Sequence, residues 1–237
     1  MKKKFQSFFD QISRLSKTVD DYKKATTQAP DHGMAHVNWG LQLMDEGDLE
    51  GALDKFRQAT EMAPNRSETY TNWGIVLAKM DRLEEAIEKF EKASQLDPKV
   101  AINYVLHGAA LVELERLQEA CQIYEHAIEV DPNNPEPYVN WGIALSRIGE
   151  YYKAIDRFKM ALALYQYQPQ VYFLWGAVLA ELGAYSEAID KFQVTLRYFP
   201  KHVDALHFWS VCENRQGRPK EAIKLARQAL EIDAVSY

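Results

Sequence analysis

Apolar positions along this chain recur with a fixed period of 34 residues from about residue 33 to residue 236. Inside each period they fall three, four or seven residues apart in two separate runs, the spacing of a helix that buries one face. Glycine commonly lies between the two runs, and proline follows the second run, which it cannot extend as a helix. The pattern therefore predicts two helices joined by a short turn in every period.

Three small residues and two aromatic residues define the repeat. Position eight holds Gly40, Gly74, Gly108, Gly142, Gly176 and then Ser210. Alanine recurs at positions 20 and 27, as in Ala52 and Ala59, and position 24 is Phe56, Phe90, Tyr124, Phe158 or Phe192. Position seven holds all five tryptophans, Trp39, Trp73, Trp141, Trp175 and Trp209, with His107 in the remaining unit. Small residues at fixed positions indicate that helix backbones approach closely there, and we assign the tryptophans to packing.

The period divides the chain into six units with a preceding segment. The units are 33–66, 67–100, 101–134, 135–168, 169–202 and an atypical terminal unit, 203–237. Because neither helix of a unit can bury its apolar face alone, the units must stack. Some residues of the segment 1–32 keep the spacing of the repeat. We expect this segment to form an N-terminal helical cap, a possible degenerate repeat.

These features resemble the tetratricopeptide repeat: small residue, Ala and Ala at positions 8, 20 and 27, an aromatic near 24 and Pro at 32. Tyr70, Tyr104, Tyr138 and Tyr172 stand at position four, where that family often has Trp, and we interpret this as a packing variation. The resemblance implies an all-α, right-handed α-solenoid of about six 34-residue helix-turn-helix repeats. It also implies a non-catalytic protein–protein interaction module.

Composition and charge narrow the classes of partner. A formal net charge of -6 argues against nucleic acid, whose backbone requires a basic surface. No apolar run approaches the roughly 18 residues that span a bilayer. Cys121 and Cys212 have no metal or redox spacing and replace apolar residues, so we expect buried, reduced thiols and a cytoplasmic location.

The N-terminal segment has a basic tip followed by Phe5, Phe8, Phe9, Ile12 and Leu15 at helical spacing. Polar residues interrupt this stretch, which argues against a signal peptide. A stripe of this kind could contact a membrane surface. Packing against the repeats of the same chain is the favoured interpretation.

Signatures of catalysis are missing from the sequence. It contains no phosphate-binding Gly-rich loop, no Gly-x-Ser-x-Gly elbow and no His-Glu-x-x-His motif. The repeats account for nearly every residue. We therefore expect no catalytic residues, no metal site and no cofactor.

The candidate site follows from the resemblance, in which the first helix of each pair lines a concave groove. Asn38, Asn72 and Asn140 occupy one groove position, and an amide can both donate to and accept from a peptide backbone. Around them we expect an apolar groove. The predicted peptide-binding residues are Val37, Asn38, Leu41, Thr71, Asn72, Ile75, Val105, Ala109, Val139, Asn140, Ile143, Phe173, Leu174, Ala177, His207 and Val211.

Two further expectations concern the partner. Family members that bind acidic C-terminal tails of chaperones use Lys and Arg in the groove, whereas positions two and five here carry none, so we expect no such tail to bind. The predicted ligand is an extended or helical segment of another protein. The alternative is a self-assembling scaffold that oligomerises through repeat ends and aromatic edges such as Tyr165, Tyr167, Tyr198 and Phe199, possibly at a membrane or organelle surface.

Overall fold

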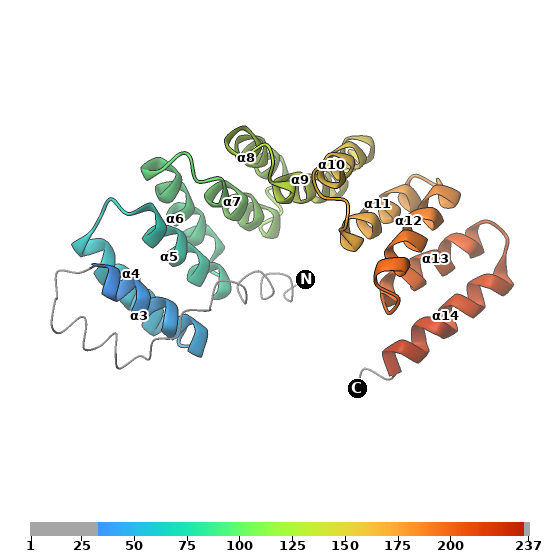
Figure 1. The fold of residues 1–237 in the computed structure, drawn as a ribbon, viewed down its shortest axis with the longest axis horizontal. Coiled ribbons are helices and arrows are strands. Elements are labelled where there is room, and N and C mark those ends of the chain that lie inside the picture. The colour runs from blue at the N-terminus through green and yellow to red at the C-terminus, as the bar shows by residue number, and fades with distance from the viewer. Residues whose placement is uncertain (1–32, 235–237) are drawn as a thin grey trace. The chain divides into compact units, whose positions relative to one another are not determined.

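Residues 33–234, the part that the computed structural model describes, form twelve α-helices and no strand (Figure 1). The helices are α3 (Gly33–Glu46), α4 (Leu49–Met62), α5 (Ser67–Lys79), α6 (Leu83–Leu96), α7 (Ala101–Glu113), α8 (Leu117–Val130), α9 (Pro135–Ile148), α10 (Tyr151–Leu164), α11 (Pro169–Glu181), α12 (Tyr185–Tyr198), α13 (Val203–Arg215) and α14 (Pro219–Ala234). The predicted all-α repeat fold is confirmed. The predicted cap, residues 1–32, lies outside the described residues.

The helices are organised as hairpins in two compact units. Helices α3–α8 belong to the first unit, which ends at Val130, and α9–α14 belong to the second, which begins at Asp131. Each odd-numbered helix packs against the helix that follows it, forming a hairpin. Within each unit the second helix of one hairpin also packs against the first helix of the next, as α4 does with α5 and α12 with α13. Each unit is therefore a stack of three hairpins.

Local sequence signals set several helix ends. The Asp48 carboxylate accepts a hydrogen bond from the Gly51 amide at the start of α4, and the Asn134 side chain accepts one from the Glu136 amide at the start of α9. Such caps satisfy N–H groups that have no partner inside the helix. Gly149 ends α9 in the left-handed conformation, with φ of 93°. These contacts join residues close together in the sequence, so they depend on the Asp, Asn or Gly at the helix end and not on distant parts of the chain.

The turn inside each hairpin requires a positive φ at position 15. Gly47, Gly149, Gly183 and Gly217 have φ between 76° and 93°. The same turn is made by Asp81 and Glu115, with φ of 63° and 57°. A side chain in this region costs roughly 1 kcal/mol or more, so these two turns are less favourable than their glycine counterparts.

In the core of a hairpin, an aromatic ring packs directly against a glycine. A Cβ added at Gly74, Gly108 or Gly142 would lie 2.5 Å from Cε1 of the ring at position 24. The rings of Phe56, Phe158 and Phe192 are fully buried. In the last hairpin Ser210 replaces the glycine and Ala226 replaces the ring. The loss of the ring makes room for the serine side chain.

The two cysteines differ from each other in burial. Cys212 is fully buried, and burial raises the pKa of its thiol to about 11, as expected of an inert thiol. Cys121 is only partly buried, so the prediction of a buried residue is wrong for it. Residue 121 lies on α8, the last helix of the first unit, so no later helix of that unit covers it.

Candidate functional site

The predicted peptide-binding residues all lie on first helices of hairpins. In the first unit they belong to α3, α5 and α7, and in the second unit to α9, α11 and α13. Helix α5 contacts both α3 and α7, and α11 contacts both α9 and α13. The predicted residues thus lie on neighbouring helices within each unit, forming one candidate surface per unit.

Burial separates these residues into two groups. Val37, Ile75 and Val105 are at most 3% exposed, and Asn72 is 9% exposed. The others are partly exposed, except His207 and Val211, which are exposed. Three buried aliphatic side chains offer almost no area to a ligand. The accessible apolar members are therefore Leu41 and Ala109 in the first unit, and Val139, Ile143, Phe173, Leu174, Ala177 and Val211 in the second.

The three asparagines have unused hydrogen-bonding capacity. No side-chain hydrogen bond joins Asn38, Asn72 or Asn140 to another residue in the range 33–234. Each amide can donate two hydrogen bonds and accept two. Asn72 is the most buried of the three, with 9% of its surface exposed.

The Thr71 hydroxyl belongs to an internal hydrogen-bond network that the sequence did not predict. Its hydroxyl donates to Oδ1 of Asn103 at 2.6 Å, and Nδ2 of Asn103 donates to the Ser67 hydroxyl at 3.2 Å. The Ser67 hydroxyl in turn donates to the carbonyl of Ala93 at 2.9 Å. Asn103 is fully buried. This chain of hydrogen bonds joins α5, α6 and α7, and no repeated pattern marks its central residue.

In the second unit, Phe173 belongs to an aromatic cluster. Its ring centroid lies 4.8 Å from that of His202 and 5.5 Å from that of Phe208, which it meets edge-on. Phe192 completes the cluster, 6.1 Å from Phe208. Burial lowers the pKa of His202, so its imidazole is neutral near pH 7 and packs as an aromatic ring. Phe173 of α11 therefore packs against rings of α12 and α13.

A row of cations covers the tryptophans on the side of the second helices. Lys55 lies 4.3 Å from the ring centroid of Trp39, and Lys89 lies 4.5 Å from that of Trp73. The second unit repeats the arrangement, with Arg157 over Trp141 and Lys191 over Trp175, both at 4.3 Å.

The sequence contained a signal for these pairs. All four cations occupy position 23, and the two hairpins without such a pair carry the apolar residues Ile123 and Leu225 there. Trp209, which has no cation at position 23, instead donates from Nε1 to Oε1 of Glu213 at 2.8 Å. The tryptophans thus contact the side of the stack formed by the second helices, which agrees with their assignment to packing.

His107 occupies the tryptophan position of the third hairpin and is 7% exposed. Burial, aided by the nearby charge of Arg116, lowers the pKa of its imidazole to about 4. The Glu91 carboxylate lies 3.8 Å from Nε2, but that side chain is half exposed to water, so it does not offset burial. His107 is accordingly neutral near pH 7.

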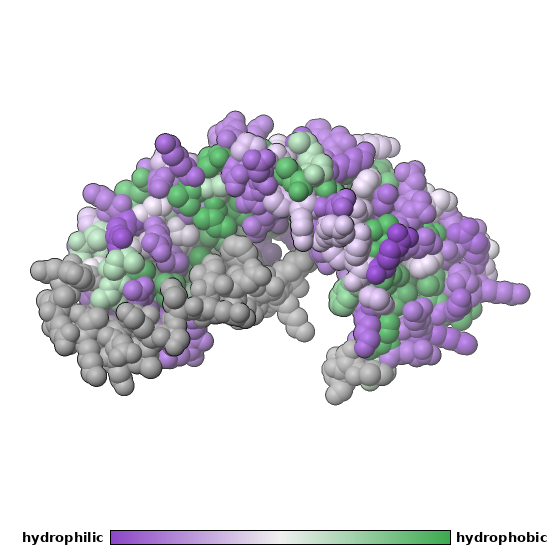
Figure 2. Space-filling view, in the orientation of Figure 1, coloured by the Kyte–Doolittle hydropathy of each residue, from purple (hydrophilic) through white to green (hydrophobic). Residues whose placement is uncertain are grey.

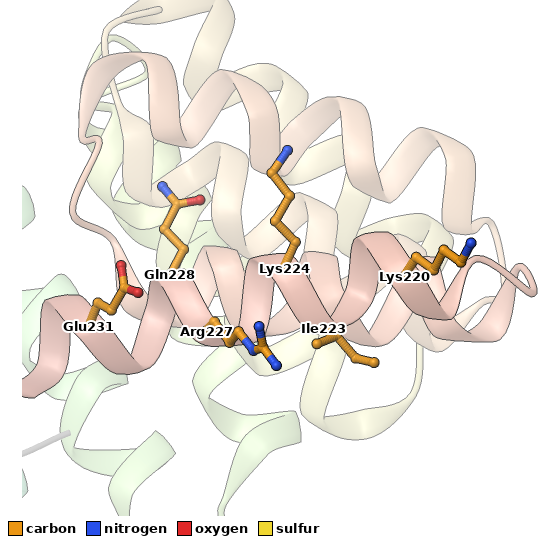
Figure 3. Close-up of a pocket in the computed structure, with 6 residues that line it drawn as sticks. All are labelled: Lys220, Ile223, Lys224, Arg227, Gln228 and Glu231. Carbon is orange, nitrogen blue, oxygen red and sulfur yellow. The ribbon is translucent and has the colours of Figure 1, made fainter.

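Within residues 33–234, no three His, Cys, Asp or Glu side chains gather as a metal site. One shallow hollow is lined by Lys220, Ile223, Lys224, Arg227, Gln228 and Glu231, all from α14 (Figure 3). None of these was predicted to bind peptide. Hydrophilic residues make up most of the coloured surface in Figure 2, with hydrophobic residues interspersed among them.

Membrane insertion of the described part can be assessed from its helices. None of the twelve helices combines the length and the apolar content that a bilayer crossing requires.

Solved structures with similar folds are numerous. A structure titled "Crystal structure of YrrB: a TPR protein with an unusual peptide-binding site" matches with a TM-score of 0.66 and 22% identity, covering 80% of this chain and 98% of that one. PilF of Pseudomonas aeruginosa matches with a TM-score of 0.71 and 21% identity, covering 83% and 89%. MamA protein matches with a TM-score of 0.64 and 23% identity, covering 71% and 92%. At these identities the similarity establishes the fold.

Family models identify the repeat itself. The model described as Psidin, N-terminal TPR repeats region, matches residues 42–197, and the model described as Tetratricopeptide repeat matches residues 179–236. No curated protein matches the sequence. Together the two models cover nearly all of the described helices, and the chain belongs to the tetratricopeptide repeat family, a class of protein–protein interaction modules.

Proposed function

We propose that this protein binds an extended segment of a partner protein along the first helices of the hairpins within each compact unit, and acts as a non-catalytic adaptor or scaffold. The observation that carries the proposal is the set of three asparagines, Asn38, Asn72 and Asn140, whose side chains have no hydrogen-bond partner among the described residues. They recur at the same position of α3, α5 and α9.

An unpaired asparagine amide is better suited to bind the backbone of a peptide than to bind a charged side chain of the peptide. The backbone of an extended segment presents one N–H donor and one C=O acceptor per residue, and an asparagine amide can satisfy both. Each such hydrogen bond contributes about 1 kcal/mol net of water. Affinity would therefore depend little on the ligand's sequence at these points.

Apolar neighbours would supply the remaining affinity and the selectivity. Leu41 and Ala109 are partly exposed on α3 and α7, and Ile143, Leu174 and Phe173 are partly exposed on α9 and α11. Burying two or three ligand side chains against such residues contributes roughly 1.5–3 kcal/mol each, while ordering the ligand costs about 2–5 kcal/mol. The balance corresponds to micromolar binding of a segment with apolar anchors.

The test begins with selection of peptides from a random display library on the full chain, followed by calorimetry with the strongest binder. Replacing Asn38, Asn72 and Asn140 together by Ala is expected to weaken binding about tenfold or more while thermal stability changes little. Asn65→Ala, an exposed asparagine in the turn between α4 and α5, serves as the matched control and should leave the affinity unchanged. Equal affinities of the triple variant and the control would refute the role of the asparagines.

A further inference from the structure

The candidate surface of the second unit has an acidic rim at the start of its first helices. Position two of the repeat is Glu136 in α9, Gln170 in α11 and Asp204 in α13. Each lies four residues before position six and seven before position nine, so it shares the helix face that carries the predicted peptide-binding residues. In the first unit, position two holds one acid, Glu68, and is otherwise apolar. The rim with two acids is therefore particular to the second unit.

Neither acid of this rim is paired with a cation of the chain. Between residues 33 and 234, no Lys or Arg side chain forms an ion pair with Glu136 or Asp204. Asp204 is exposed, whereas Glu136 is partly buried, and burial raises the pKa of the Glu136 carboxyl. A carboxylate that loses water without gaining a cation is in an unfavourable environment. A positive charge supplied by a ligand relieves this cost at Glu136.

Apolar side chains lie beside the acidic rim on the same helix face. The opposite rim, at position 13, is about 16 Å farther along the helices and carries both signs of charge. A segment that crosses the apolar rows thus meets only negative charge on one flank. The rows are Asn140, Leu174 and Phe208 at position six and Ile143, Ala177 and Val211 at position nine, all at least partly exposed, and the opposite rim is Arg147, Glu181 and Arg215.

We propose that the second unit binds an apolar segment flanked by basic residues, with one Lys or Arg facing Glu136 and another facing Asp204. The proposal rests on the function proposed above and specifies the ligand of the same surface. Helix α11 contacts both α9 and α13. Packed helices lie about 8–10 Å apart, which places the two acids roughly 16–20 Å from each other. An extended chain advances about 3.3 Å per residue, so basic residues about five or six positions apart reach both acids.

Peptide selection on the full chain tests this chemistry. A random display library is selected in parallel on wild type and on a double variant, Glu136→Gln with Asp204→Asn. Wild type is expected to enrich segments in which Lys or Arg flank apolar residues, and the double variant should lose this enrichment. In calorimetry, the strongest wild-type binder should bind the double variant about fivefold or more weakly. Added salt should weaken its binding to wild type more than its binding to the double variant.

A second double variant separates this rim from the general negative charge of the protein. Glu187→Gln with Asp190→Asn removes two exposed acids of α12, a second helix, and changes the net charge equally. This matched control should bind the same peptide with wild-type affinity. Thermal unfolding of both double variants reports any loss of helix stability, because acids in a first turn also stabilise the helix itself.

Charge reversal gives a readout that a merely structural role would not produce. The variant Glu136→Lys with Asp204→Lys should prefer the selected peptide carrying Glu in place of its basic residues over the original peptide. Loss of stability lowers the affinity for both peptides and cannot invert the preference between them.

The outcomes distinguish this proposal from the proposed function. If the selected segments are not enriched in basic residues, or if the Glu136→Gln, Asp204→Asn variant binds like the control, the basic ligand is refuted. Loss of binding in the triple asparagine variant would then still support the proposed function. Binding that requires the two acids but not the asparagines supports the basic ligand and refutes the role of the asparagines. A wild type that selects no peptide at all overturns both.

Discussion

At the scale of single residues, glycine has two distinct roles in this fold. At position eight it gives space, since a Cβ on Gly176 would lie 2.7 Å from Cε1 of the Phe192 ring. At position 15 it gives backbone freedom, since Gly183 has φ of 77° and nothing lies within 4 Å of an added Cβ. The two glycines are seven residues apart in one hairpin, so their roles can be compared directly.

We expect Gly183→Ala to lower the free energy of unfolding by about 1 kcal/mol, the cost of a side chain at positive φ. Gly176→Ala should cost about 2–3 kcal/mol, because the Phe192 ring is fully buried and must shift. Chemical denaturation of both variants measures the difference. A larger loss for Gly183→Ala than for Gly176→Ala would contradict this separation of roles.

At the scale of helices, each hairpin is stabilised by contacts between its own two helices and by contacts with the preceding hairpin. Trp175 shows this, because Lys191 of the same hairpin lies 4.3 Å from its ring centroid and Lys159 of the preceding hairpin lies 5.7 Å away. Where His107 replaces tryptophan, the same location holds a titratable ring between α6 and α8. Its environment makes the stability of that hairpin dependent on pH.

The low pKa of His107 predicts the direction in which pH changes the stability of the folded protein. The pKa is about 4 in the folded protein and about 6.5 unfolded, so both states hold a neutral ring above pH 6.5. Below pH 6.5 the unfolded state binds a proton that the folded state excludes, and the protein loses stability progressively until about pH 4. The loss attributable to this residue is about 3 kcal/mol.

Urea denaturation of wild type and His107→Trp between pH 7.5 and 4.5 measures this dependence. The variant, which restores the residue found in the other hairpins, should gain stability relative to wild type as the pH falls. His126→Gln, at an exposed position on α8, is the matched control and should follow wild type. A constant difference between His107→Trp and wild type over the pH range would show that the histidine does not titrate as described.

At the scale of the whole molecule, each hairpin contacts its sequence neighbours within its unit and does not enclose a common core. Stability in such a stack is approximately a sum of hairpin terms and terms between neighbours. The hydrogen bonds through Asn103, which join α5, α6 and α7, are one such neighbour term. A local defect should accordingly have a local effect.

Hydrogen exchange can show this locality. Gly176→Ala is expected to accelerate exchange in α11 and α12, and more weakly in α10 and α13, which contact them. Helices α3 to α6 should keep wild-type protection, because they belong to the other compact unit. Uniform acceleration along the whole chain would instead indicate a single cooperative unit.

The sequence by itself determined the helices, their pairing and the close approach of helices at the small residues, because these depend on the period of 3.6 residues and on nearest neighbours in the chain. It also singled out Asn38, Asn72 and Asn140 as candidate ligand-binding residues, since they recur at one position of the repeat. Only the tertiary structure decided which groove positions are accessible: Val37 and Ile75 are buried, whereas Leu41 remains partly exposed. It alone revealed that Thr71 is held by Asn103 and that Ile223 and Leu230 are exposed. Burial and side-chain partners come from helices far apart in the sequence, and a periodic pattern carries no information about which neighbour is present.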